Sequence, residues 1–302
     1  MREQIRELAR RQDAVIMAHY YQTEDVRALA DVVGDSFELA RRAGDTEWET
    51  IVLCGVKFMA EVAKILNPHK RVLLPSPEAG CPLADMASPG DVIALKEKHP
   101  GAAVMCYVNS SAALKAVSDV CCTSSTAVRI AAALPNREII FVPDQNLGAY
   151  VQSKLPGKHI IPFEGCCPIH HHVGVEDVAA ARDTLPGAPV LVHPECRPVV
   201  QREADFIGST AAIIDYVDRH EYDAYIIGTE IEIERLLRRR HPNKAFVTLS
   251  PDMLCKQMKK TRVEDVFNVL ERGGNEVSLT DDEMLAAQNC LTRMIELGTY
   301  DR

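Results

Sequence analysis

Three stretches of the chain share one pattern and decide the fold: AVIMAHYY at residues 14–21, AAVMCYVN at residues 102–109 and APVLVHPE at residues 188–195. In each stretch an apolar run is followed at once by polar side chains. The second stretch starts 88 residues after the first (102 − 14), and the third starts 86 residues after the second (188 − 102). Self-similarity at a nearly fixed period indicates repeated structural units. We therefore expect three copies of one unit.

Each copy continues in the same order. A helix-length segment leads to a second apolar run that ends near Asp31, Asp119 or Asp205, and a small polar turn and another helix follow. A third apolar run occupies residues 51–54, 139–142 or 225–227, and a short fourth run closes the unit, as at residues 72–74. Continuous apolar strands that alternate with helices indicate a parallel sheet covered on both faces. The sequence thus predicts an α/β protein of three pseudo-threefold-related, three-layer αβα domains at residues 1–87, 88–172 and 173–302, the last with a C-terminal helical segment.

Polar side chains recur at the end of the first strand of every copy. The pairs are His19 and Tyr21, Tyr107 and Asn109, and His193 and Glu195. Triplication without a shared site is one explanation of the repeats. However, open parallel sheets bind ligands at the carboxyl edge of their strands. We therefore expect the three sheet edges to face one active-site cavity at the common interface of the domains.

Three of the ten cysteines follow the same period. Cys81, Cys167 and Cys255 are separated by 86 and 88 residues, and each falls in a loop after the fourth strand of its unit. Three thiolates on a pseudo-threefold axis form a trigonal set with one position open, which suits a [4Fe–4S] cluster or a catalytic zinc ion. Chance spacing is the alternative, and Cys166 competes with Cys167 for the register.

Composition excludes several classes of protein. The chain has 302 residues, 34 Lys and Arg against 43 Asp and Glu, and a net charge of −9. No overall positive field exists to hold nucleic acid or an anionic membrane. No apolar run approaches the roughly 20 residues of a membrane span, and the charged N-terminal segment has no apolar signal core. A cytoplasmic protein with reduced thiols, free for metal binding or catalysis, is expected.

Two further groups of residues suggest chemistry. Ser36, Ser124 and Thr210 are threefold-related hydroxyls before helical patterns, where they either cap the helix or help bind carboxylates and phosphates. His193 and Glu195 lie two residues apart at a strand end and can share proton transfer, although such a pair taken alone is more often structural. We interpret the three histidines at residues 170–172 as mostly a polar loop, with His170 behind the Cys167 ligand.

Nine motifs together resemble the quinolinate synthase family over nearly the whole chain. They are AHYYQ at residues 18–22, GDS at 34–36, GVKFMAE at 55–61, YVNSSA at 107–112, CTSS at 122–125, PDQNLG at 143–148, HPEC at 193–196, GST at 208–210 and CxxMKK at 255–260. The resemblance implies a transferase of de novo NAD synthesis that condenses iminoaspartate with dihydroxyacetone phosphate to quinolinate, with release of phosphate and water. It also implies a [4Fe–4S] cluster on Cys81, Cys167 and Cys255.

The resemblance further implies roles for the residues at the strand ends. By position, the substrate-binding residues are His19, Ser36, Tyr107, Asn109, Ser124, His193, Glu195 and Thr210. Tyr21, His193 and Glu195 are the expected catalytic residues, and the cluster iron without a thiolate is the expected Lewis acid. Thr126, Cys166, Glu232 and Gln257 depart from the family pattern.

The identity of the partner and two other classes of protein remain open at this point. A transient L-aspartate oxidase or dehydrogenase partner could deliver iminoaspartate. A zinc lyase or aldolase would use the same three thiolates, and an iron–sulfur sensor would use the cluster without catalysis. The sensor lacks support because the chain has no basic segment for DNA binding.

Overall fold

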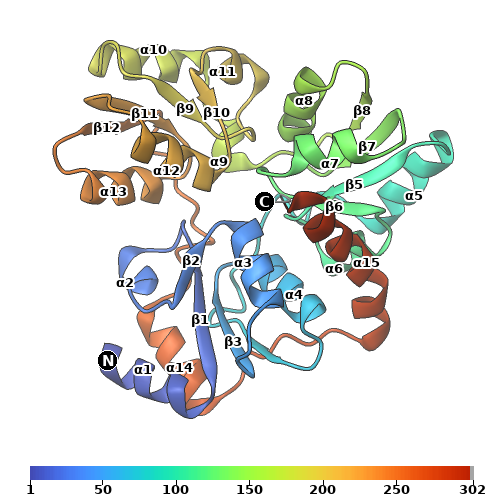
Figure 1. Cartoon of the computed structure of the whole chain (residues 1–302), viewed down its shortest axis with the longest axis vertical. Helices are drawn as coiled ribbons and strands as arrows, with labels where there is room; N and C mark the ends of the chain where they lie inside the picture. Colours follow the sequence, from blue (N-terminus) through green and yellow to red (C-terminus); the bar gives the residue numbers. More distant parts are fainter. Residues whose placement is uncertain (300–302) are drawn as a thin grey trace.

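The structure is a computed structural model that describes residues 1–299. It contains three four-stranded sheets, all of them parallel, in the strand orders β2-β1-β3-β4, β6-β5-β7-β8 and β10-β9-β11-β12. The same order occurs three times, so the predicted fold of three α/β units is confirmed. Figure 1 shows the three sheets arranged around the middle of the molecule.

The three units have matching elements. The first unit contains α1 (Arg2–Arg11), β1 (Ala14–His19), α2 (Glu24–Arg27), β2 (Val32–Gly34), α3 (Ser36–Gly44), β3 (Thr50–Cys54), α4 (Lys57–Leu66) and β4 (Arg71–Leu73). The second contains α5 (Pro89–Lys98), β5 (Ala103–Tyr107), α6 (Ala112–Ala116), β6 (Val120–Cys122), α7 (Ala127–Ala133), β7 (Glu138–Val142), α8 (Gln145–Lys154) and β8 (His159–Pro162). The third contains α10 (Val175–Thr184), β9 (Val190–Val192), α11 (Pro198–Arg202), β10 (Phe206–Ile207), α12 (Thr210–Arg219), β11 (Ala224–Gly228), α13 (Ile231–Arg240) and β12 (Ala245–Thr248). The short helix α9 (Pro168–His171) connects the second unit to the third and has no counterpart in the repeat.

The second strand of each unit begins directly after its repeated aspartate, whereas the prediction had an apolar run ending there. The reason is a hydrogen bond that recurs in all three units. The Oδ2 atoms of Asp31, Asp119 and Asp205 accept backbone N–H groups from the first strand, at 2.9, 2.7 and 2.8 Å respectively. Each carboxylate thus ties the start of its own strand to the neighbouring first strand.

Both faces of each sheet pack against apolar side chains. Because a strand in such a sheet is buried on both sides, its residues are apolar without interruption. The strands β1, β3 and β5 are buried along their whole length. In the third unit one face of the sheet packs around Val178 and Val200, and the opposite face packs around Ile213 and Ile233. Helices therefore cover both faces, as the three-layer prediction required.

The C-terminal helices pack away from the third sheet (Figure 1). The helix α14 (Val263–Arg272) lies against α1, where Val266 and Leu270 share a buried cluster with Ile5. The helix α15 (Asp281–Gly298) lies against α6 and β6. These helices cover the first two units, and the predicted boundaries at residues 87 and 172 stay a prediction. No helix within residues 1–299 combines the length and apolar character that crossing a membrane requires.

Candidate active site

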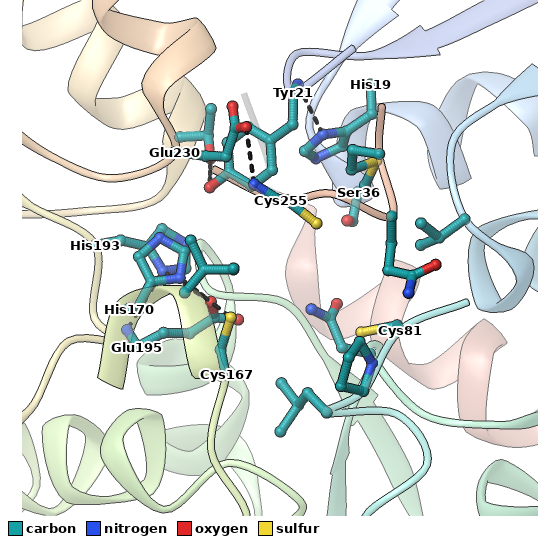
Figure 2. A pocket seen from close by; sticks show the side chains of 18 of the residues that line it. His19, Tyr21, Ser36, Cys81, Cys167, His170, His193, Glu195, Glu230 and Cys255 are labelled. Atoms are coloured by element: carbon teal, nitrogen blue, oxygen red, sulfur yellow. Dashed lines mark hydrogen bonds and ion pairs between the residues drawn. The ribbon is translucent and has the colours of Figure 1, made fainter. Parts of the chain in front are cut away.

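A cavity of about 430 Å³ lies between the three units. Figure 2 shows side chains from all three units around its open centre. Every residue that the sequence singled out for the site lines this cavity: His19, Tyr21, Ser36, Cys81, Tyr107, Asn109, Ser124, Cys167, His193, Glu195, Thr210 and Cys255. The expected convergence of the three sheet edges is therefore present, while the role of each residue stays a prediction.

Strand ends position the polar pairs. His19 and Tyr107 are the last residues of β1 and β5, and His193 directly follows β9. In the first and third units the histidine also shapes the turn, because its Nδ1 accepts the backbone N–H of the residue two positions on. These bonds are Tyr21 N to His19 Nδ1 at 3.1 Å and Glu195 N to His193 Nδ1 at 3.3 Å.

Glu195 sits between two buried histidines. Its Oε2 lies 2.7 Å from Nδ1 of His170 and 3.6 Å from Nδ1 of His193, and the two imidazole rings stack with centroids 4.8 Å apart. Burial lowers the pKa of His193 to about 3. Burial opposes ionisation of Glu195, but the adjacent histidine rings and hydrogen bonds from His170 and Tyr107 outweigh it and lower the pKa of Glu195. At neutral pH the site therefore holds a carboxylate beside a neutral His193.

A chain of hydroxyl groups connects Tyr21 to His170. Thr210 Oγ1 donates to the Tyr21 hydroxyl at 2.9 Å, and that hydroxyl lies 2.8 Å from Thr229 Oγ1. Thr229 Oγ1 lies 3.0 Å from Nε2 of His170. Burial raises the pKa of Tyr21 well above its ordinary value, so this phenol stays protonated and keeps the chain intact at neutral pH. The sequence placed His170 behind Cys167 and did not indicate its contact with Glu195.

Ser36, Ser124 and Thr210 do not occupy the N-cap positions of their helices. Each lies one or more residues away from the N-cap. Asp35 caps α3 by accepting the N–H groups of Phe37 and Glu38, and Ser209 caps α12. Ser36 and Thr210 are instead the first residues of these helices and line the cavity. Ser124 lies three residues before α7. The capping alternative is therefore wrong for all three hydroxyls.

Buried carboxylates hold two of the three cysteine loops, those of Cys167 and Cys255. Figure 2 shows the sulfur atoms of Cys81, Cys167 and Cys255 facing the open centre from three sides. Asp144 Oδ2 accepts the N–H of Cys167 at 3.0 Å, and Glu230 Oε1 accepts the N–H of Cys255 at 3.1 Å. These two carboxylates are fully buried, and both follow the third strand of their units. Their spacing of 86 residues (230 − 144) was the signal in the sequence that could have revealed them.

The model of the family described as quinolinate synthetase A protein matches residues 3–296. The chain belongs to this family. Relatives called quinolinate synthase support the match: one from Caldicellulosiruptor saccharolyticus is 48% identical over 298 residues, covering 99% of this chain and 98% of the relative. One from Clostridium kluyveri is 47% identical over 294 residues, with 97% of each covered. A quinolinate synthase 2 from Methanosarcina acetivorans is 47% identical over 297 residues, with 98% and 95% covered.

In this quinolinate synthetase family member, Cys81, Cys167 and Cys255 are the candidate metal-binding thiols. All ten cysteines are free thiols. Burial raises the pKa of Cys81 to about 12, that of Cys167 well above its ordinary value, and that of Cys255. A coordinating metal reverses this because it deprotonates a thiol outright. The half-buried Cys166 is not among the residues that line the cavity, whereas Cys54 and Cys290 are buried in the apolar core.

A second set of donors lies beside the first. Sγ of Cys167, a ring nitrogen of His170 and a carboxylate oxygen of Glu195 all lie within 4.8 Å of one another. Sulfur, nitrogen and oxygen donors together suit a zinc ion. Cys167 belongs to both sets. A single ion at this second set would use one cysteine loop, whereas both the cluster and the zinc alternative predicted from the sequence use three.

Proposed function

We propose that this chain condenses iminoaspartate with dihydroxyacetone phosphate to give quinolinate, with release of phosphate and water. We further propose that Cys81, Cys167 and Cys255 hold a [4Fe–4S] cluster. The observation that carries the proposal is the arrangement of one cysteine from each unit around a cavity lined by three polar strand ends, in a member of this family. When bound, the cluster would supply a Lewis-acid iron that has no protein thiolate.

The cavity has features that suit anionic substrates. Iminoaspartate carries two carboxylates and the triose carries a phosphate. Ser36 and Thr210 line the cavity at the N-termini of α3 and α12, where the helix dipole favours anions. Within the described residues, Oδ1 of Asn109 is buried without a hydrogen-bond partner. An N–H or hydroxyl group of a substrate would satisfy it, and the hydroxyl of Ser124 supplies one more polar contact.

The residues around Glu195 are suited to proton transfer. The condensation needs protons removed from carbon and delivered to a departing hydroxyl group. Glu195 is ionised and can accept a proton at Oε2, and His193 is neutral, so one of its ring nitrogens can accept and the other donate. Tyr21 stays protonated and can donate its hydroxyl hydrogen while Thr210 donates to its oxygen. His19 and Tyr107, also buried on the cavity, would orient the substrate.

The chemistry of iminoaspartate indicates which kind of partner enzyme would supply it. Iminoaspartate forms when the amine of aspartate is oxidised, so a transient L-aspartate oxidase or dehydrogenase would supply it. The free thiols fit a reducing, cytoplasmic location.

Iron analysis of cysteine variants tests the cluster, and product analysis tests the reaction. After anaerobic reconstitution, Cys81→Ser, Cys167→Ser and Cys255→Ser should each lose most of their iron, whereas the core variants Cys54→Ser and Cys290→Ser should keep it. Cys166→Ser is the adjacent control and should also keep its iron. Wild-type protein mixed with the two substrates should form quinolinate and phosphate.

Three outcomes would contradict the proposal. Bound zinc that depends on His170 and Cys167, with no dependence on Cys81, would favour the single-ion site. Retention of iron in Cys167→Ser with loss in Cys166→Ser would move the ligand by one residue. A full cluster with no quinolinate formed would leave the sensor as the better explanation.

A further inference from the structure

One position of the repeat carries a long, buried hydrogen-bond donor in all three units. The residues are Arg27, Lys115 and Gln201, and their spacings of 88 and 86 residues match the period of the units. Their exposed fractions are 7%, 0% and 7%, and none of them is among the residues that line the cavity. Burying such side chains is costly unless their N–H groups are bonded. Their partners therefore indicate what these side chains do.

In the first unit the donor brackets Tyr21, which means that it bonds the carbonyl groups of the residues directly before and after it. Nη1 of Arg27 donates to the backbone carbonyl oxygen of Tyr20 at 2.7 Å and to that of Gln22. These two carbonyl groups stand on either side of Tyr21, whose own side chain reaches the cavity.

In the second unit the donor brackets Asn109 in the same way. Nζ of Lys115 donates to the carbonyl oxygen of Val108 at 2.9 Å and to that of Ser110, and it also reaches the Ser110 hydroxyl at 3.2 Å. The lysine belongs to α6, the short helix that follows the strand end.

In the third unit the donor brackets Glu195. Nε2 of Gln201, in α11, donates to the carbonyl oxygens of Pro194 at 2.9 Å and of Cys196 at 2.8 Å. The accepting residues of the three units, 20 and 22, 108 and 110, 194 and 196, obey the period of the repeat. The same backbone positions are therefore held in every unit by chemically different donors.

Each donor also contacts the neighbouring unit, again at one repeated position. Arg27 pairs with Glu232 Oε2 at 3.4 Å, Lys115 Nζ lies 5.7 Å from the ring centroid of Phe58, and Gln201 Nε2 donates to the carbonyl oxygen of Asn146 at 3.4 Å. Phe58, Asn146 and Glu232 are themselves 88 and 86 residues apart, and each is the second residue of its helix, α4, α8 or α13. The contacts run from the first unit to the third, from the second to the first and from the third to the second.

We propose that Arg27, Lys115 and Gln201 are positioning residues, each of which holds one strand-end loop against the neighbouring unit and so aims Tyr21, Asn109 or Glu195 into the cavity. The inference takes the cavity as the active site proposed above. The arrangement differs from ordinary core packing because the hydrogen bonds of each donor go to the loop around one site residue, and one further contact crosses the interface. Loss of a donor should therefore loosen one loop and leave the other two in place.

Hydrogen–deuterium exchange measures this directly and needs no substrate. The amides of Gln22, Ser110 and Cys196 report on the three loops, because each donates within its loop at 2.8–3.0 Å. Met is nearly the same length as Lys and has no donor. In Lys115→Met we expect peptides that cover residues 107–110 to exchange roughly tenfold faster, while those that cover residues 19–22 and 193–196 change less than about twofold. Gln201→Met should act in the same selective way on residues 193–196.

Matched variants separate positioning from general destabilisation. Arg27→Lys keeps a donor of the kind used in the second unit, so its 19–22 peptide should exchange more slowly than that of Arg27→Met. Exposed Lys98→Met and Arg202→Met, in the second and third units, should change none of the three loops. If Lys115→Met does not fold, Gln201→Met makes the same test without removing a charge.

Two results would overturn the inference: unchanged exchange at the bracketed loop, or equal acceleration at all three loops. Because neither depends on turnover, the inference can fail while quinolinate is formed, and it can hold while the proposed reaction fails.

Discussion

Asp144 and Glu230 offer the sharpest test of how the chain holds a cluster. Asp144 is fully buried, and its two oxygens accept the backbone N–H groups of Leu147 at 2.8 Å and Cys167 at 3.0 Å. Asp144→Asn keeps the shape of the side chain but replaces one acceptor by an NH₂ group. One of the two buried N–H groups then faces a donor and loses its hydrogen bond. The change reaches the cysteine loop without touching sulfur.

The expected loss of free energy follows from the one hydrogen bond that Asp144→Asn removes. A buried N–H group left without an acceptor costs about 1–3 kcal/mol, which corresponds to roughly 5- to 150-fold less of the ordered Cys167 loop. Glu230→Gln should cost more than Asp144→Asn, because Glu230 Oε1 also accepts Lys259 Nζ at 2.6 Å and the substitution leaves that cation without its charge partner. The first unit has Val56 at the equivalent position and lacks this carboxylate.

The rate at which reconstituted protein releases iron to a chelator under anaerobic conditions measures the effect. We expect faster release from Asp144→Asn and still faster release from Glu230→Gln. Asp177→Asn is a matched control, since Asp177 accepts the backbone N–H of Gly174 at 2.8 Å at the start of α10, and neither residue lines the cavity. Release at the wild-type rate in Asp144→Asn, or equal acceleration in Asp177→Asn, would refute the reasoning.

Three further predictions concern the cavity itself. Thr210→Ala should keep its iron but weaken binding of quinolinate by about 1–3 kcal/mol, measured by titration calorimetry, because a buried polar partner loses a hydrogen bond; unchanged binding would make this hydroxyl incidental. Glu195→Gln should also keep its iron and lose most turnover, and full activity would exclude Glu195 as the proton acceptor. Burial lowers the pKa of His19 from 6.5 to about 3, so its contribution to stability is complete above pH 6.5 and falls by about 1.4 kcal/mol per pH unit as the pH drops toward 3. Urea unfolding at several pH values should therefore show a shallower loss of stability in His19→Asn, and identical slopes would mean that this histidine titrates normally.

The repeated architecture was legible in the sequence because burial on both faces of a parallel sheet leaves a visible signal. The runs that became β1, β5 and β9 are apolar without interruption, and their period predicted the three α/β units that the three sheets confirm. The second strands were misplaced because they are only two or three residues long. At that length the position is set by the hydrogen bond from Asp31 or its equivalents, which hydrophobicity does not reveal.

The site was predictable where the repeat or a family motif marked it. The sequence predicts residues 170–172 as mostly a polar loop, with His170 behind Cys167, because three consecutive histidines carry no periodic signal. The burial of His170 to 1% and its contact with Glu195 arise from tertiary packing. Arg27, Lys115 and Gln201 escaped notice for another reason. Their residue types differ, and only the positions of their carbonyl partners show that they do the same thing.

Two repeated positions differ in whether the residue type is the same in all three units, and their contacts explain the difference. Asp31 and its two equivalents are identical because they face the same partner, a backbone N–H of the first strand, in every unit. The donor position faces a different neighbour in each unit, and its residue type follows that neighbour. Arg27 meets the carboxylate of Glu232, Lys115 meets the ring of Phe58, and Gln201 meets a neutral carbonyl. A buried charge needs a charged or aromatic partner, whereas a neutral amide does not. The three units have therefore kept the geometry of the loops while the interface between units determined the chemistry of the residue that holds each loop.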